Sequence, residues 1–142
     1  MTRSGSPLDA LQTTLAAEHA AVFVYGALGA QTSQSATPQL FADVTDAYTT
    51  HQQRRDALIA IIEDAGGDPV AAQAGYELPE DLSTPAAVTG RALRLEQGAA
   101  STYAFLVAST TGRERSWGVD ALVDTAVREL RFGGRPETLP GL

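Results

Sequence analysis

Glutamate and histidine side chains recur in this sequence where they could meet inside a helical protein. The candidates are Glu18, His51, Glu96 and Glu129. Carboxylate oxygens and a neutral imidazole are ligands that suit iron, manganese or zinc. Burying a lone carboxylate is costly, so several of them in one core need a proton, a cationic partner or a metal ion. These residue types indicate either a metal centre or a buried hydrogen-bonded network.

Each of these side chains lies on an apolar helical face. When residues are placed at 100° intervals, mainly apolar neighbours surround every one of the four. The neighbours are Leu11, Leu15, Val22 and Tyr25 for Glu18; Val44, Tyr48, Arg55, Leu58 and Ile62 for His51; Ala92, Leu93, Ala100, Tyr103 and Val107 for Glu96; and Leu122 and Ala126 for Glu129. We therefore expect each helix to bury one ionisable group, and the four groups to converge.

Two kinds of centre would satisfy these groups. In the first, Glu18, His51, Glu96 and Glu129 hold one iron, manganese or zinc ion. In the second, arginines form charge-assisted hydrogen bonds with the glutamates, His51 joins them neutral or protonated, and tyrosines donate their hydroxyls. The further members of this buried network would be Tyr25, Tyr48, Arg54, Arg55 and Tyr103. The sequence allows both.

The elements that position these residues are all α-helices. Apolar residues recur at intervals of three and four, and strand patterns are nearly missing. Prolines stand at the expected helix starts, and the pairs Gly66-Gly67 and Gly133-Gly134 stand at helix ends. We predict one domain over residues 1–142, with helices at about 8–30, 38–65, 85–110 and 116–132, a connection over 66–83 and an extended tail over 133–142.

The long connection decides the predicted topology. Residues 66–83 could reach along the whole length of a 20-residue helix. Two antiparallel helix hairpins joined by this crossover are therefore expected, and a partly structured surface loop is the alternative. An internal repeat supports the two hairpins, because Leu15-x-x-Glu18 with Tyr25 matches Leu93-x-x-Glu96 with Tyr103 at the same offsets.

On these residues the chain resembles the ferritin-like superfamily, and in particular an uncharacterised bacterial branch, a domain of unknown function. That superfamily has one Glu on each of two helices and Glu-x-x-His on each of the other two. Glu18 and Glu96 match the single-Glu positions, and Glu129 matches the second Glu-x-x-His. The first of these motifs reads His51-x-x-Arg54 and the second ends at Phe132. The resemblance therefore implies a ferritin-like four-helix bundle with a degenerate di-iron ligand pattern.

Composition excludes several functions. Ten Arg and no Lys stand against 17 acidic residues, which gives a net charge of −7 and no basic surface for nucleic acid or an anionic membrane. Cysteine is absent, so disulfides and thiolate chemistry are excluded. The longest apolar run, residues 20–25, cannot span a bilayer, and no export signal is evident. We expect a cytoplasmic protein.

Apolar side chains away from the ionisable groups suggest further contacts. Val123, Val127 and Leu130 form a second strip on the fourth helix, and Phe23 lies on the outer side of the first. The crossover, the tail or a second subunit could cover them. The sequence thus predicts a non-enzymatic bundle that self-associates, as a homodimer, or binds a partner. The alternative is a mononuclear metal protein in oxidant or metal handling, whose only enzymatic form would be a metal-dependent oxidoreductase.

Overall fold

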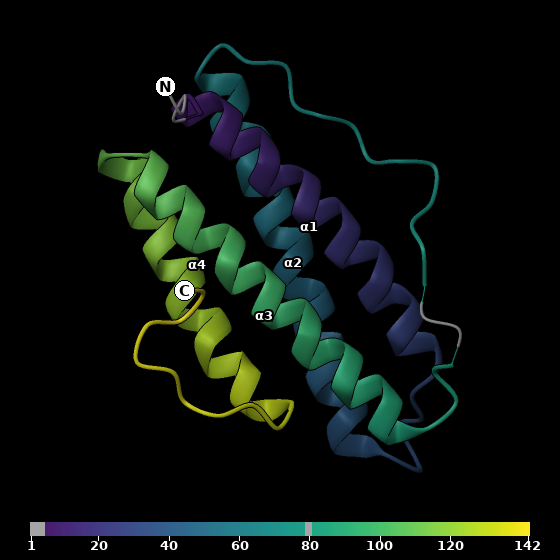
Figure 1. Cartoon of the computed structure of the whole chain (residues 1–142). Coiled ribbons are helices and arrows are strands. Elements are labelled where there is room, and N and C mark those ends of the chain that lie inside the picture. The colour runs from purple at the N-terminus through teal and green to yellow at the C-terminus, as the bar shows by residue number, and fades with distance from the viewer. Residues whose placement is uncertain (1–4, 79–80) are drawn as a thin grey trace.

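Four α-helices make up the regular structure of residues 5–78 and 81–142, which the computed structural model describes (Figure 1). They are α1 (Pro7–Ala30), α2 (Pro38–Asp64), α3 (Pro85–Ser109) and α4 (Gly112–Arg131). No strand occurs within these residues. The prediction of an all-α four-helix fold is confirmed.

The helix starts follow from local chemistry. Proline occupies the first position of α1, α2 and α3, where its missing N–H is not needed. The Ser6 hydroxyl accepts a hydrogen bond from the Asp9 amide at 3.1 Å, and the Asp9 carboxylate accepts one in return from the Ser6 amide at 3.3 Å. The Thr84 hydroxyl caps α3 in the same way, by accepting from the amide of Ala87 at 3.1 Å.

The fourth helix begins earlier than the predicted residue 116. Gly112 is its first residue and has a φ of +60°. Glycine adopts this left-handed conformation without strain, so the chain can turn sharply and enter the helix at once. Glu114 in the first turn adds a favourable charge at the helix N-terminus.

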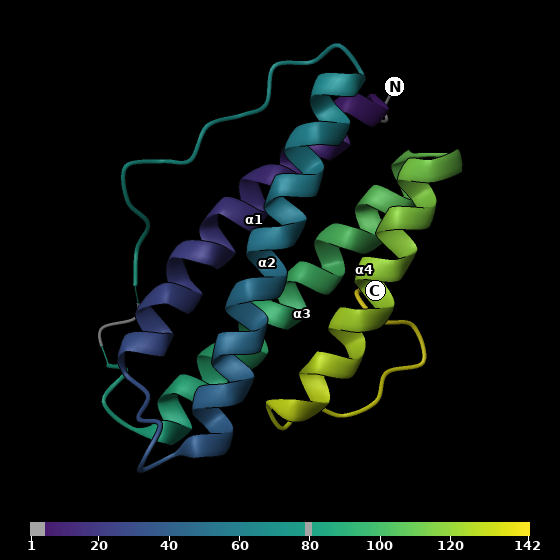
Figure 2. The same ribbon diagram turned by 180° about the vertical axis from the view of Figure 1, so that it is seen from behind.

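The helices form two antiparallel hairpins, α1 with α2 and α3 with α4, and the connection between them runs the length of the bundle (Figures 1 and 2). Along this path the connection follows the outer face of α1. Gln12 hydrogen-bonds the carbonyl of Asp68 at 2.6 Å, and Tyr76 packs against Phe23 with ring centroids 5.4 Å apart. The crossover therefore covers Phe23 in part, since its side chain is still 40% exposed, and it leaves α1 and α3 antiparallel.

The core has two apolar clusters with a charged layer between them. One lies toward the end of the bundle where α3 begins, and the other lies toward the end where α2 finishes. Their buried members are Val24, Tyr25, Leu28, Val44, Ala47, Val88, Ala92 and Phe132 in the first, and Ala10, Leu11, Leu15, Leu58, Ile62 and Leu106 in the second. In sequence, Glu18, His51 and Glu96 fall between the two clusters on α1, α2 and α3, so apolar packing holds the charged layer from both sides.

Helix α4 buries its polar face and exposes its apolar one. Thr125, Arg128 and Glu129 are at most 5% exposed, and Gly118 and Ala121 on the same face are also buried. Val119, Val123, Val127 and Leu130 are 41–59% exposed. None of the helices within residues 5–78 and 81–142 combines the length and the apolar character needed to cross a membrane.

The turn after α4 yields a prediction about two glycines. Gly134 donates its amide to the Glu129 carbonyl at 2.9 Å, and a Cβ at Gly134 would lie 2.8 Å from that oxygen. We expect Gly134→Ala to lower the free energy of unfolding by about 1–3 kcal/mol, because backbone must move to admit the methyl group. In Gly98→Ala within α3, the added methyl group would meet no atom within 4 Å. This substitution should raise the free energy of unfolding by about 0.5–1 kcal/mol. Urea unfolding of both variants measures the two changes in the free energy of unfolding. Changes of the same sign in the two variants would contradict the prediction.

Candidate functional site

His51 lies at the centre of the buried layer, between two glutamates. Its Nδ1 lies 2.6 Å from Oε2 of Glu18, and its Nε2 lies 2.8 Å from Oε2 of Glu96. All three side chains are at most 3% exposed. Helices α1, α2 and α3 thus each contribute one ionisable group to a single cluster.

Two tyrosines complete this cluster reciprocally. Tyr25 of α1 donates its hydroxyl to Glu96 of α3 at 2.9 Å, while Tyr103 of α3 donates to Glu18 of α1. Each tyrosine lies seven residues after the glutamate of its own helix, and because α1 and α3 are antiparallel it meets the glutamate of the other. The Tyr25 ring also stacks on His51 with centroids 5.3 Å apart. The internal repeat of the sequence therefore gives two equivalent tyrosine–glutamate hydrogen bonds, related by pseudo-symmetry between α1 and α3.

The cluster favours the protonated form of His51. Burial alone would lower the pKa of the imidazole, but the hydrogen bonds to Glu18 and Glu96 outweigh it and raise the pKa from 6.5 to about 9. At neutral pH both ring nitrogens therefore donate, one to each carboxylate. Burial and the nearby carboxylates also raise the pKa of Tyr25 and Tyr103, so both phenols stay protonated as donors.

Arg54 belongs to the network, but it does not bond a glutamate. Its guanidinium donates to the Tyr103 hydroxyl at 3.1 Å, to Thr125 at 2.8 Å and to Asp124 at 2.5 Å. It also lies over the Tyr103 ring, 5.1 Å from the centroid. The expected bonds from Arg54 to the glutamates are thus replaced by contacts to α4, because α2 faces α4 on that side of the bundle.

Two predicted members lie outside the network. Arg55 faces partly toward solvent, where it pairs with the neighbouring Asp56 at 2.9 Å. Tyr48 is partly buried and packs against the apolar cluster near Gly26. Both residues lie at the edge of the inward face of α2. Their position around the helix is close to that of His51, which is why the sequence predicted them, although neither contacts it.

Arg128 is a buried member that sequence reasoning missed. It is 5% exposed, and its guanidinium donates to Asp124 at 2.5 Å, to Asp46 at 3.1 Å and to Thr50 at 3.2 Å. One of its nitrogens lies 3.7 Å from Oε1 of Glu96. Burial alone would lower the pKa of Arg128, but its acidic neighbours outweigh that effect and raise it. The imidazolium and this guanidinium together balance the charges of Glu18 and Glu96.

Glu129 is buried beside the cluster and does not hydrogen-bond His51. Burial raises its pKa from 4.5 to about 7, and the charges of Glu137 in the tail and of Glu96 add to this effect. Its Oε1 has no hydrogen-bond partner within the part of the chain that the structure describes. Of the four residues predicted to converge, Glu18, His51 and Glu96 form one cluster, and Glu129 borders it without a hydrogen bond to His51.

The raised pKa of Glu129 leads to a prediction. The folded state holds this proton more tightly than the unfolded chain does, so stability falls as pH rises from about 4.5 to about 7. Glu129→Gln should therefore raise the free energy of unfolding by about 1–2 kcal/mol at pH 8 and leave it nearly unchanged at pH 4. Urea unfolding at both pH values checks this, with Glu63→Gln on the surface as the control. A less stable Glu129→Gln at pH 8 would contradict it.

The donors in this arrangement do not fit a metal centre. Both nitrogens of His51 are occupied by carboxylates, and the nearby guanidinium of Arg128 cannot act as a ligand. Within residues 5–78 and 81–142, no three or more His, Cys, Asp or Glu side chains gather so that they could hold a metal ion. Ligation by His51 would require it to leave Glu18 or Glu96 first.

Comparison with known proteins gives a family and a fold without an activity. A family model described as "Domain of unknown function (DUF4439)" matches residues 10–142. The crystal structure of a conserved hypothetical protein from Mycobacterium tuberculosis is similar to this chain, with 31% sequence identity and a TM-score of 0.81. The match covers 89% of this chain and 94% of that one. No curated protein matches the chain.

Proposed function

Because the chain belongs to the DUF4439 family, whose description names no activity, we propose a function from its buried centre. The protein is a non-enzymatic bundle of the ferritin-like kind, in which the hydrogen-bonded His51 imidazolium replaces a metal ion. One observation carries this proposal: the two ring nitrogens of His51 lie 2.6 Å and 2.8 Å from two buried carboxylates. A side chain held in this way is neither a free ligand nor an available acid or base.

The ferritin-like kinship is supported by topology and by residue positions. The long crossover makes α2 and α3 run in the same direction, as expected when two hairpins are joined across the length of a bundle (Figure 2). Glu18 and Glu96, which match the single-Glu positions of that superfamily, both point into the centre.

The network would fix how the helices pack. Charged groups at the level of His51 can be satisfied in only one register, because a one-turn shift of α3 would leave Glu96 without His51 and Tyr25. Buried ionic groups specify packing in some proteins at a cost in stability. In this chain the network joins all four helices, since Arg54 and Arg128 connect it to α2 and α4.

The proposed activity is association, with a second copy of the chain as the partner. The exposed strip of Val119, Val123, Val127 and Leu130 follows one face of α4 for most of its length. Such a strip packs well against an identical antiparallel helix. We expect sedimentation equilibrium to show a dimer that Val123→Glu with Val127→Glu converts to monomer. A chain that stays monomeric at high concentration would remove self-association from the proposal.

Metal analysis tests the centre itself. Protein purified without added metal should contain only traces of iron, manganese and zinc, and should gain no stability when these ions are added. The alternative is a metal-binding protein that uses Glu18, His51, Glu96 and Glu129. A stoichiometric metal that is lost in Glu18→Ala, and retained in the surface control Glu63→Ala, would establish that alternative and overturn the proposal.

A further inference from the structure

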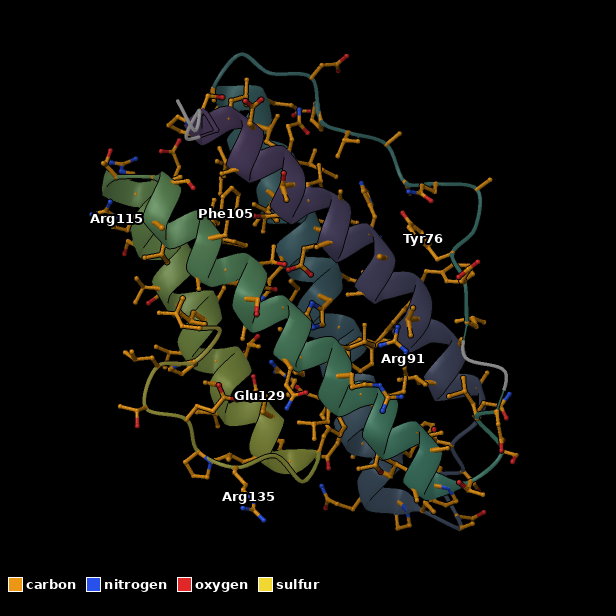
Figure 3. The ribbon with its side chains drawn as sticks, viewed as in Figure 1. Tyr76, Arg91, Phe105, Arg115, Glu129 and Arg135 are labelled. Carbon is orange, nitrogen blue, oxygen red and sulfur yellow. The ribbon has the colours of Figure 1, made fainter. Side chains whose placement is uncertain are left out.

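A cavity of about 330 Å³ opens between α1 and α3, on the side of the bundle where Arg91 lies (Figure 3). Its floor is formed by the buried Glu18, His51 and Tyr103. Its walls are small or aliphatic residues: Ala17, Ala20, Ala21, Leu95, Gly98 and Ala99. Cavities that hold small molecules begin at about this volume and are mostly apolar with a few polar groups.

Two arginines line the cavity at its outer edge. Arg94 is exposed and Arg91 is half-buried, one helical turn away on α3. Within residues 5–78 and 81–142, neither forms an ion pair with an acidic side chain. Burial and the like charge of Arg94 lower the pKa of Arg91. Two adjacent guanidiniums without an acidic partner form a site for an anionic group, which they can bind in a bidentate manner.

The polar floor determines how a ligand would lie. The carboxylates of Glu18 and Glu96 already accept from both ring nitrogens of His51, and Glu18 accepts from the Tyr103 hydroxyl, so these donors are not available to a second anion. An anionic head is therefore stable at the arginines and unstable at the floor. The rest of the lining is alanine, glycine and leucine surface together with Thr102, whose hydroxyl is already bonded to the Gly98 carbonyl, and this surface favours an apolar body.

We propose that this cavity binds a small amphipathic anion. Its carboxylate or phosphate head would lie between Arg91 and Arg94, and its apolar body would lie against α1 and α3. At about 30 Å³ for each water-sized group, the volume admits about ten non-hydrogen atoms. This inference goes beyond the proposed function, because it depends neither on self-association nor on the occupancy of the buried centre.

Gly98 provides a way to close the cavity without disturbing the helices. A Cβ at this position would meet no atom within 4 Å, because the space beside Gly98 is part of the cavity. Leucine at position 98 can therefore fill the site while α3 keeps its packing. Gly98→Leu is the first test variant, and Arg91→Gln with Arg94→Gln is the second.

Isothermal titration calorimetry on the full chain provides the test, with octanoate and octyl phosphate as probes. We expect at least one of them to bind with a stoichiometry of one, and octanol and acetate to bind at least about tenfold more weakly, because each lacks one half of the recognition. Which of the two probes binds more tightly distinguishes a carboxylate head from a phosphate head.

The variants separate the site from general charge effects. Removing both arginines at the cavity, or filling it with Gly98→Leu, should weaken binding about tenfold or more. The matched control is Arg113→Gln with Arg135→Gln, which removes the same charge away from the cavity and should bind like the native chain. Circular dichroism verifies that each variant is folded. The proposal is overturned if neither probe binds, if octanol binds as tightly as octanoate, or if folded Gly98→Leu binds both probes unchanged.

Discussion

Replacing His51 with leucine should lower the free energy of unfolding by about 3–5 kcal/mol near pH 7. The substitution removes a cation that donates to Glu18 and Glu96, both at most 2% exposed. The two carboxylates would then lie buried, close together and without the charge that holds them. Urea unfolding monitored by circular dichroism measures this loss.

The pH dependence of the same variant identifies the cause. The folded state raises the pKa of His51 from 6.5 to about 9, so the proton contributes stability that is complete below about pH 6.5 and lost as pH rises through about 9. This shift corresponds to at most about 3 kcal/mol. The native chain should lose stability across this window, and His51→Leu should lose less. Equal slopes from pH 6.5 to 9 would contradict a protonated His51 in the folded state.

The second histidine provides the matched control. His19 lies at the surface of α1, where Nε2 is 2.9 Å from the carbonyl of Val70 in the crossover. His19→Leu should cost less than about 1 kcal/mol, because water can replace that bond. Adding Glu18→Gln and Glu96→Gln to His51→Leu should recover part of the loss, since it removes the unpaired charges. A penalty that persists in full would indicate that lost packing, and not charge, explains the effect.

The burial of the glutamates could be predicted from the sequence because it depends only on which face of its own helix each residue occupies. Glu18 and Glu96 stand in the middle of apolar stripes, so a helical angle is enough to place them inside. His51 follows from the same reasoning on α2. The position of a residue around its helix does not identify its hydrogen-bond partner on another helix. Arg54 reaches Asp124 of α4 because of how α2 and α4 pack, and no local sequence pattern encodes that distance.

On α4 the same reasoning placed Glu129 inside and the strip of Val123, Val127 and Leu130 away from it, as observed, but it did not find Arg128. The apolar residues Val119, Val123 and Val127 of α4 are exposed, so the stripe with the most hydrophobic character is not the one that faces the core. Arg128 was therefore missed. A signal was present, because one face of the helix, at intervals of three and four, carries small or polar residues and an aromatic one: Ala121, Thr125, Arg128 and Phe132. A helix whose buried face serves a charged centre has no reason to be apolar there. Exposed apolar residues on α4 are consistent with a surface that another molecule covers.

Replacing Arg128 with methionine should lower the free energy of unfolding by about 2–4 kcal/mol. Asp46 and Asp124, which accept its hydrogen bonds, are about half-exposed, so water can solvate them when the guanidinium is gone. Glu96 is fully buried and cannot be solvated in this way. The cost is therefore dominated by the uncompensated charge of Glu96, although the ion pair to Glu96 is longer than the other two. Chemical denaturation at neutral pH measures it.

Arg131 provides the control for this interpretation, because it contacts the same aspartate from the surface. Its guanidinium donates to Asp46 at 2.9 Å and is about half-exposed. Arg131→Met should cost less than about 1 kcal/mol, as exposed ion pairs do. Raising the salt concentration should reduce that small cost and leave the effect of Arg128→Met nearly unchanged, because screening acts weakly on buried charges. Similar costs for both variants would mean that Asp46, and not Glu96, is what Arg128 stabilises, and the charge balance proposed for the centre would be wrong.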